Sequence, residues 1–455
     1  LQYRFLDLRS DKLKNNLILR AQVLQFLRNQ MIEQGFLEVQ TPILTTSSPE
    51  GARDYLVPSR LHPGKFYALP QAPQQFKQLL MVSGIDKYFQ IAPCFRDEDA
   101  RSDRAPGEFY QLDMEMSYAT QEDVFNVMEP VIYNTFKKFS DKKISQYPFP
   151  RISYKDAMVK YGTDKPDLRN PLFIIDVTEF FQRCTFKPFI NRTVRAIKVH
   201  ADMSKGFHEK MLAFATSIGM GGLGYLEVEE DLSYKGPIDK FIPDDMKKEL
   251  LDLADLKYGD TIFFIADNEK RANDFAGQIR TELGKRLNLI DESLFSFCWI
   301  IDFPMFELNE RNQVEFSHNP FSMPQGGLDA LMTKEPLDIL AYQYDIVCNG
   351  VELSSGAVRN HDIDIMIKAF EIAGYSKKHI EEKFGALFNA FQFGAPPHAG
   401  IAPGIDRMLM LLSNSETIRD VIAFPLNSKA QDLMMGAPGN VTFDQLRDVH
   451  ISITK

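Results

Sequence analysis

Residues 109–118 alternate between apolar and polar side chains, and this alternation limits the possible folds of the 455-residue chain more than any other feature. Successive side chains of a strand point to opposite faces of a sheet. One face of this predicted strand carries Tyr110, Leu112, Met114 and Met116, and the other carries Phe109, Gln111, Asp113 and Glu115. The apolar face needs a layer of helices behind it. The polar face, with its two carboxylates, has to border solvent or a ligand cleft.

The residues that precede this strand predict a long helix followed by another strand. Apolar side chains recur every three to four positions over residues 11–34, which is the helical period. Gly35 fits the left-handed position after a helix end, and residues 36–39 have the composition of a strand. Residues 88–95 predict a further strand, which a charged loop joins to residues 109–118.

The length of the chain predicts two or three domains, because a single hydrophobic core rarely grows beyond about 250–300 residues. Residues 165–290 are rich in Lys, Asp and Glu and contain short strand and helix signals, which is typical of a separate inserted domain. The apolar strand predicted at residues 297–303 resumes the earlier pattern. We therefore expect an α+β protein with segments 1–164, 165–290, 291–430 and 431–455.

Composition excludes some classes of protein. No run of about 18 apolar residues could span a bilayer, and the first residues lack a secretory signal. We interpret Leu1 as a truncated or processed end.

The cysteines are Cys94, Cys184, Cys298 and Cys348. They lie far apart without a CxxC pair, which indicates reduced thiols and a cytoplasmic location. The net charge of -10 argues against general affinity for nucleic acid but allows a local basic face.

Residues 219–224 match the pattern G-x-G-x-x-G of dinucleotide-binding proteins. That reading requires a strand before the glycines and a helix after them. Here the order is reversed, with a predicted helix over residues 207–217 and a predicted strand over residues 225–229. We therefore predict a simple turn. No G-x-x-x-x-G-K-[ST] sequence is present, so any ATP site has to use another scaffold.

Asn349-Gly350 predicts a hairpin with a two-residue type I′ turn. This register places Glu352 opposite Val347 and Asp345 opposite Ser354, so the two acidic residues lie diagonally on one face of the ribbon. Two adjacent carboxylates are costly unless a cation lies between them, and Mg²⁺ that carries nucleotide phosphates would serve. A solvated hairpin edge is an equally good interpretation of the spacing alone.

Arg359 follows on the same strand, where strict alternation would turn it to the face opposite Glu352. A β-bulge in Ser354-Ser355-Gly356 would return Arg359 to the face of the acidic pair. This is a prediction from parity. A regular ladder through these three residues would count against Arg359 as a ligand.

Two further segments have the composition of a nucleotide site. The loop that starts at Arg96 is dense in charge and leads into the strand that begins with Phe109, whose ring could stack on adenine while Arg96 pairs with phosphate. Residues 404–407 (Gly-Ile-Asp-Arg) open a predicted helix, and helix N-termini attract anions. A solvated loop and an ordinary helix start are the alternatives.

Taken together, three of these segments resemble the signature motifs of the class II aminoacyl-tRNA synthetases. They are residues 11–42, residues 89–116 with Phe95-Arg96-Asp97-Glu98, and residues 394–413 with Gly404-Ile405-Asp406-Arg407. Residues 48–58, 71–77 and 162–169 are similar to the bacterial-type aspartyl-tRNA synthetases, which include mitochondrial forms. The resemblance covers nearly the whole chain. It departs from the family at His318-Asn319 and at Ser354-Ser355-Gly356.

The resemblance implies a set of site residues. For aspartate they are Glu50, Gln74, Lys77, Arg96, Asp113, His318 and Arg359. For ATP they are Arg96, Asp97, Glu98, Phe109, Glu352, Gly404, Ile405, Asp406 and Arg407. Asp345 and Glu352 would bind Mg²⁺, and Arg96 and Arg407 would act on the phosphates in catalysis.

The resemblance also implies a fold and partners. The fold would be an antiparallel sheet flanked by helices, in a catalytic domain formed by residues 1–164 and 291–430, with an inserted α+β domain at residues 165–290 and a C-terminal extension at residues 431–455. The family's N-terminal anticodon-binding barrel is expected to be missing. Expected partners are L-aspartate, ATP, tRNA(Asp) and a second copy of the chain in a homodimer. Whether tRNA(Asn) is also charged is left open.

Other functions share parts of this sequence pattern. An asparagine or lysine synthetase is the nearest alternative, and the cations Lys77 and Arg359 argue against lysine. An ammonia-dependent asparagine synthetase would lack the inserted segment. A non-catalytic relative that binds RNA or a partner would be favoured by loss of Arg96, Glu352 or Arg407, and all three are present.

Overall fold

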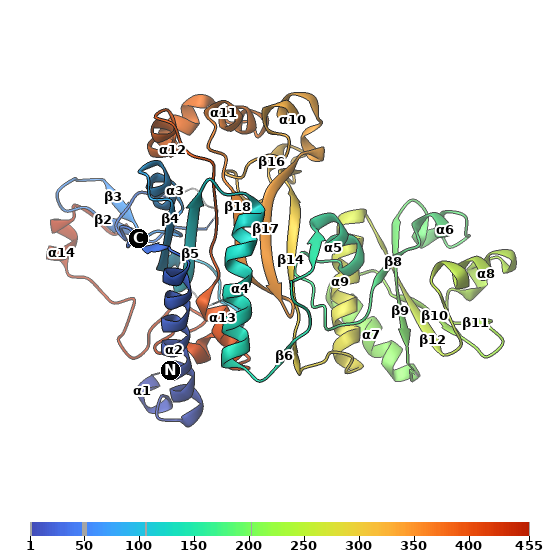
Figure 1. Ribbon diagram of the computed structural model, residues 1–455. Helices are drawn as coiled ribbons and strands as arrows, with labels where there is room; N and C mark the ends of the chain where they lie inside the picture. Colours follow the sequence, from blue (N-terminus) through green and yellow to red (C-terminus); the bar gives the residue numbers. More distant parts are fainter. Residues whose placement is uncertain (1, 48–51, 105–106, 202, 455) are drawn as a thin grey trace.

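The computed structural model describes residues 2–47, 52–104, 107–201 and 203–454. Its largest element is an eight-stranded sheet in the order β1-β4-β5-β19-β18-β17-β14-β7 (Figure 1). The strands are β1 (Leu37–Glu38), β4 (Lys87–Arg96), β5 (Gly107–Ser117), β19 (His398–Ile401), β18 (Val351–Val358), β17 (Leu340–Cys348), β14 (Phe297–Pro304) and β7 (Arg151–Ser153). Neighbours from β4 to β14 are antiparallel, and one parallel strand lies at each edge. The expected mostly antiparallel sheet is therefore confirmed.

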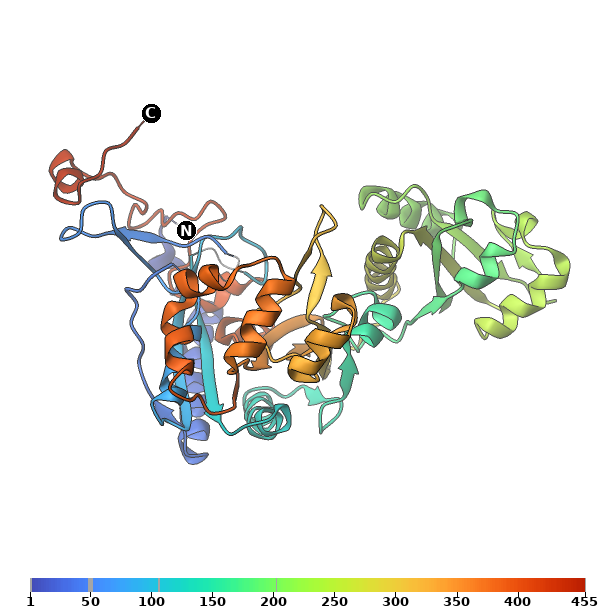
Figure 2. The ribbon, with the colours of Figure 1, turned by 90° about the horizontal axis from the view of Figure 1, so that it is seen from above.

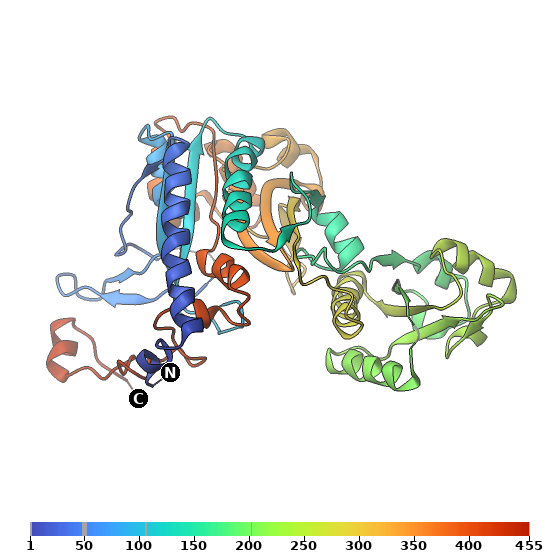
Figure 3. The same cartoon turned by 60° about the horizontal axis from the view of Figure 1, so that its bottom comes forward.

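Helices cover the apolar face of this sheet, as the alternation of residues 109–118 predicts. They are α2 (Asp11–Glu33), α4 (Gln121–Phe139) and α13 (Ile405–Leu412), and α2 and α4 lie side by side across the sheet (Figure 3). Leu112 and Met114 of β5 are fully buried against them. The helix predicted over residues 11–34 is confirmed as α2, and Gly35 follows it with a positive φ of 81°.

A second lobe extends to one side of the sheet and contains its own five-stranded antiparallel sheet, in the order β11-β10-β12-β9-β8 (Figures 1 and 2). Its elements are β8 (Ile174–Asp176), α6 (Thr178–Gln182), β9 (Thr193–His200), α7 (Lys205–Ser217), β10 (Gly224–Val228), β11 (Tyr234–Lys235), α8 (Asp244–Leu253), β12 (Asp260–Asp267) and α9 (Glu269–Arg286). Two hydrophobic clusters fill the lobe on either side of its sheet. Residues 219–223 form the turn between α7 and β10, so the prediction of a turn is confirmed.

The two lobes meet where α5 (Tyr154–Tyr161) packs against α9. Gly162 takes a left-handed conformation just after α5, and its backbone touches that of Gly277 in α9 so closely that a Cβ on either residue would collide with the other's backbone. Arg280, one turn further along α9, is almost fully buried. Its guanidinium donates to the carbonyl oxygens of residues 167, 170 and 172 at 2.6–3.0 Å and so fixes the connecting segment to α9.

The remaining α-helices lie outside the layer that covers the apolar face of the large sheet. They are α1 (Arg4–Asp7), α3 (Gln74–Val82), α10 (Gly327–Thr333), α11 (Ile363–Ile372), α12 (Lys377–Phe391) and α14 (Phe443–Asp448). Short strand pairs are β2 (Leu56–Pro58) with β3 (Phe66–Ala68), β6 (Lys143–Ile144) with β13 (Leu294–Phe295), and β15 (Phe306–Leu308) with β16 (Val314–Phe316). The segment that contains α14 runs away from the body (Figure 2). In the part of the chain that the structure describes, no helix is both long and apolar enough to cross a bilayer.

The contact between the two glycines predicts a specific sensitivity of the junction between the lobes. Gly277→Ala forces a methyl group into the backbone of Gly162, and such overpacking costs about 2 kcal/mol. We expect hydrogen–deuterium exchange to show a lower free energy of local opening for the amides of α9. Gly221→Ala is the matched control, because a Cβ there meets nothing within 4 Å. Equal protection of α9 in the two variants would contradict the prediction.

Candidate active site

Four charged side chains meet on the polar face of the large sheet, and each is at most 2% exposed. Lys77 projects from α3, Asp113 and Glu115 from β5, and Arg359 from the end of β18. The Lys77 ammonium lies 2.7 Å from Asp113 Oδ1 and 3.2 Å from Glu115 Oε2. Arg359 Nε and Nη2 donate to the two Glu115 oxygens at 2.8 and 3.2 Å. The cluster therefore contains two cations and two anions.

The two carboxyl groups of this cluster respond differently to the same burial. Burial alone would raise the pKa of Glu115, but Arg359 and Lys77 outweigh it and lower that pKa to about 2. Asp113 has only one cation at contact distance, and burial raises its pKa above the ordinary value despite Lys77. Of the two Asp113 carboxylate oxygens, Oδ1 contacts the Lys77 ammonium, and Oδ2 has no ion pair with any described residue. Asp113 is therefore the carboxyl that gains most from a further positive charge.

The register of β17 and β18 explains how Arg359 reaches this face. Glu352 lies opposite Val347, as predicted, and a bulge follows at Leu353. Asp345 consequently pairs with Ser355, so the predicted pairing of Asp345 with Ser354 is wrong by one residue. The ladder through residues 354–356 is regular, so the predicted bulge in Ser354-Ser355-Gly356 is wrong, and the bulge lies just before these residues. Its effect is the predicted one, because the extra residue places Asp345, Glu352 and Arg359 on the same face.

Asp345 and Glu352 form a second charged group on this face. Asp345 is buried, and both burial and the neighbouring Glu352 raise its pKa well above the ordinary value. The Glu352 carboxylate lies 3.3 Å from the Lys165 ammonium and 3.8 Å from Arg407 Nη1. Among the described residues, no cluster of three or more typical metal-binding side chains is found. Two carboxylates nevertheless suit Mg²⁺, which completes its shell with phosphate and water oxygens.

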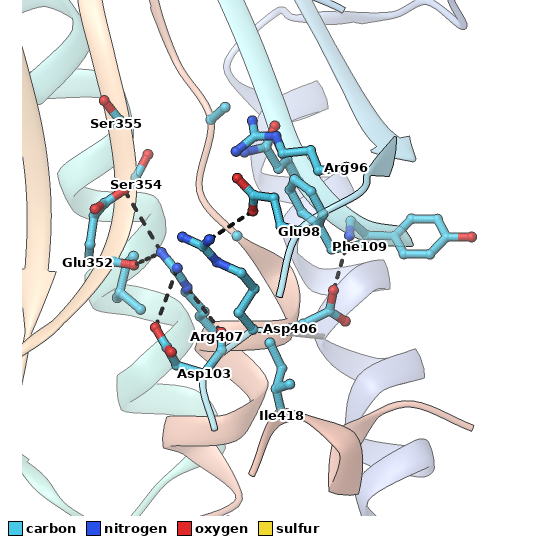
Figure 4. A pocket seen from close by; sticks show the side chains of 16 residues that line it. Arg96, Glu98, Asp103, Phe109, Glu352, Ser354, Ser355, Asp406, Arg407 and Ile418 are labelled. Atoms are coloured by element: carbon cyan, nitrogen blue, oxygen red, sulfur yellow. Dashed lines mark hydrogen bonds and ion pairs between the residues drawn. The ribbon is translucent and has the colours of Figure 1, made fainter. Parts of the chain in front are cut away.

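A cavity of about 190 Å³ opens between the motif at residues 404–407 and the strand β5 (Figure 4). It brings together most of the residues predicted to bind ATP, which line it as follows: Arg96, Glu98, Phe109, Glu352, Gly404, Asp406 and Arg407. The Arg96 guanidinium lies 5.0 Å from the centre of the Phe109 ring, and Glu98 pairs with Arg104 at 2.9 Å. Arg407 Nη1 donates to the Glu352 carbonyl at 2.7 Å. The cavity thus combines an aromatic ring with three arginines.

Not every residue predicted for ATP faces this cavity. Ile405 is fully buried in the core beneath the sheet, and Asp97 lies beside Arg53 outside the cavity lining. The Asp406 carboxylate lines the cavity but is occupied by an ion pair with Arg20 and by the amide of Tyr110, which donates to it at 3.0 Å. Asp406 therefore joins α2, β5 and α13 and has little capacity left for a ligand.

The residues predicted for aspartate are spread more widely than expected. Lys77, Asp113 and Arg359 belong to the buried cluster, whereas Gln74 donates to Gln78 at 3.0 Å within α3. His318 lies against aromatic rings, and burial lowers its pKa. The charged groups that act on His318 are Asp164, Glu307, Lys165 and Glu352, which associates it with the acidic pair. Glu50 lies outside the described residues.

Two site residues escaped sequence reasoning. Glu115 was placed on the polar face but given no role, although it is the anion shared by Arg359 and Lys77. The signal for Glu115 was present, because two cations predicted for one pocket need an internal counter-charge. Lys165 carried no such signal, since nothing in the sequence relates it to Glu352, which lies almost 190 positions further along. Only the folded chain brings them together.

The low pKa of Glu115 predicts how its contribution to stability depends on pH. Its folded pKa of about 2 lies below the ordinary value of 4.5, so its charge stabilises the folded state fully above pH 4.5 and loses this effect as the pH falls toward 2. Glu115→Gln leaves the two cations undercompensated and should cost about 3–5 kcal/mol at pH 7. We expect urea unfolding to show that this difference shrinks between pH 4.5 and 2. Glu209→Gln, at an exposed site on α7, should cost under 0.5 kcal/mol. A pH-independent difference would contradict the assignment.

Comparison with known proteins agrees with this geometry. The family described as tRNA synthetases class II (D, K and N) matches residues 1–428. The aspartate–tRNA(Asp/Asn) ligase of Ehrlichia chaffeensis is 59% identical over 463 residues, which cover all of this chain and 78% of that protein. Proteins of the same name from Wolbachia pipientis and Rickettsia prowazekii are 58% and 57% identical, again over the whole chain and 77% of each relative. The chain therefore belongs to the class II tRNA synthetases of the D, K and N family.

Proposed function

We propose that this synthetase activates L-aspartate with ATP, forms aspartyl-adenylate and transfers the aspartyl group to the 3′ end of tRNA. The observation that carries the proposal is the buried cluster of Lys77, Asp113, Glu115 and Arg359. Arg359 Nη1 has no hydrogen-bond partner among the described residues, and the Lys77 ammonium donates a hydrogen bond to Asp113 while forming an ion pair with Glu115. These donors suit a side-chain carboxylate. Asp113, whose pKa is raised, suits the ammonium group of an amino acid.

This charge arrangement favours aspartate over its closest competitors. Asparagine has nearly the size of aspartate, so shape gives little discrimination. A neutral amide beside Arg359 and Lys77 would leave cationic donors poorly paired, at a cost of about 2–5 kcal/mol. Lysine would bring a third cation to the same place and would be repelled.

The adjoining cavity suits ATP. We assign Phe109 to stacking on the adenine ring, Arg96 to the α-phosphate region and Arg407 to the terminal phosphates, with the N-terminus of α13 adding its amide donors. The attacking α-carboxylate is already an anion, so the reaction needs no protein base. Arg96 and Arg407 lower the barrier by holding the phosphates in line and neutralising developing charge. Mg²⁺, when bound to Asp345 and Glu352, would supply further positive charge to the phosphates.

We propose two further properties, the accepted tRNAs and the cellular location. Its relatives carry the name aspartate–tRNA(Asp/Asn) ligase, and we propose that this chain likewise accepts both tRNA(Asp) and tRNA(Asn). We also place it in the cytoplasm, because Cys184, Cys298 and Cys348 are buried free thiols, as is usual in a reducing compartment.

We propose in addition that the chain forms a homodimer through α2 and β1. Ile18 and Ile32 of α2 and Leu37 of β1 are 46–54% exposed, although they adjoin the buried core of the large sheet. Leu44, a little further along the chain, extends this apolar surface. A second copy that covers the same surface would remove these side chains from water.

The activation step tests the proposed substrate directly. ATP–pyrophosphate exchange should require aspartate, with asparagine and lysine giving less than about 1% of its rate. Arg359→Leu should abolish aspartate-dependent exchange, because it removes the cation that pairs with the substrate carboxylate. Arg311→Leu, at an exposed position, should keep the full rate. Exchange supported by asparagine or lysine, or retained by Arg359→Leu, would refute the proposal.

The proposed dimer has its own test. Ile32→Asp and Leu37→Asp place a charge at the centre of the proposed contact, and each should convert the dimer to a monomer in sedimentation velocity experiments. Leu212→Asp changes an equally apolar side chain that is 44% exposed on the inserted lobe, and it should leave the dimer intact. A wild-type monomer would contradict the proposed assembly.

A further inference from the structure

Lys165 brings a positive charge from the junction between the lobes to the acidic pair. Its ammonium lies 3.3 Å from Glu352 Oε2 and 2.9 Å from Asp164 Oδ2. Burial lowers the pKa of Lys165, but Glu352, Asp164 and, to a smaller extent, Asp345 outweigh it and raise that pKa. The other cation near Glu352 is Arg407. Its Nη1 lies farther from the Glu352 carboxylate, at 3.8 Å, and its guanidinium also contacts Asp103. Lys165 is therefore the closest counter-ion of Glu352 in the described part of the chain.

The backbone around Lys165 is fixed from both sides. Asp167 accepts two hydrogen bonds from the Arg169 guanidinium at 2.8 and 3.0 Å, and Arg280 of α9 holds the carbonyl of Asp167 at 3.0 Å. On the other side lies the tip of the β17–β18 hairpin, where a Cβ on Gly350 would touch Asp167 at 3.4 Å. These contacts fix the backbone from which the Lys165 side chain, which is 38% exposed, reaches Glu352.

This placement puts two cations in competition for one carboxylate. A divalent ion held by Asp345 and Glu352 would lie beside the carboxylate that Lys165 contacts, and like charges that close repel each other. In the absence of nucleotide the ammonium already neutralises Glu352, so a free divalent ion gains little by replacing it. A bound triphosphate adds negative charge, which offsets the repulsion between the metal ion and the ammonium so that both can stay near Glu352.

We infer that Lys165 is a built-in counter-ion that occupies the metal position on Glu352 until a metal–nucleotide complex arrives. Lys165 would act as a positioning residue: it keeps the acidic pair ordered and makes the site prefer metal that comes with triphosphate over free metal. The inference rests on the proposed function, because it takes Asp345 and Glu352 as the metal ligands. It also gives the inserted lobe a role, since α9 holds the segment that carries Lys165.

The test measures Mn²⁺ binding in the absence of nucleotide. Electron paramagnetic resonance reports the concentration of free Mn²⁺ and therefore the amount that is bound. Lys165→Met should bind Mn²⁺ about tenfold more tightly than the wild type, because the competing charge is gone. Lys160→Met removes an equal charge from α5, where Lys160 is 55% exposed, and should bind like the wild type. Misfolding cannot produce a tighter site. Lys165→Gln replaces Lys165→Met if thermal melting shows that the latter is unfolded.

A second pair of variants separates the inference from the proposed function. Adding Glu352→Gln to Lys165→Met should remove the gain, which shows that the extra affinity resides on the acidic pair. Unchanged or weaker Mn²⁺ binding by Lys165→Met, or a gain that survives Glu352→Gln, would overturn the inference. Neither outcome would touch the proposed substrate, because aspartate-dependent exchange by the wild type is measured independently of Lys165.

Discussion

The ion pair between Arg359 and Glu115 determines how the polar face of the large sheet is built. The two residues come from β18 and β5, which are separated by β19, so the pair has to cross that strand. Gly400 of β19 makes this crossing possible, because a Cβ there would collide with the Glu115 carboxylate. Charges buried this deeply are tolerated only when every partner is present. The strand order, the bulge at Leu353 and the helix that carries Lys77 therefore have to be correct together.

Local sequence patterns were sufficient for the framework of the fold. The alternation in residues 109–118 identified both the face that meets α2 and the face that holds the charged cluster. Helical periodicity followed by Gly35 predicted the end of α2, because backbone geometry and glycine conformation act over a few residues. Parity along the hairpin required a bulge before Arg359. The predicted location in Ser354-Ser355-Gly356 was wrong by one residue, because parity does not distinguish Leu353 from the residues after it as the extra position.

Features that depend on distant contacts could not be predicted. The ion pair of Arg20 with Asp406 spans 386 positions, and the family resemblance assigned Asp406 to ATP where the fold uses it to join α2 to α13. His318, which comes just after β16 in the sequence, similarly lies close enough to Glu352 and Lys165 for their charges to act on its pKa. Composition and spacing carry no information on such pairs. The resemblance to a family supplied residue types for the site, whereas the fold determines which of them share a pocket.

The contact between Gly162 and Gly277 affects how the inserted lobe could have been acquired or exchanged. A lobe joined through long linkers can be transplanted between proteins as a self-contained unit. Here one glycine belongs to the host sequence after α5 and the other to the guest helix α9, and neither position accepts a larger residue while the other backbone lies against it. A chimaera that carries the lobe into a new host would have to import both glycines together, so the two sequences are expected to change in concert.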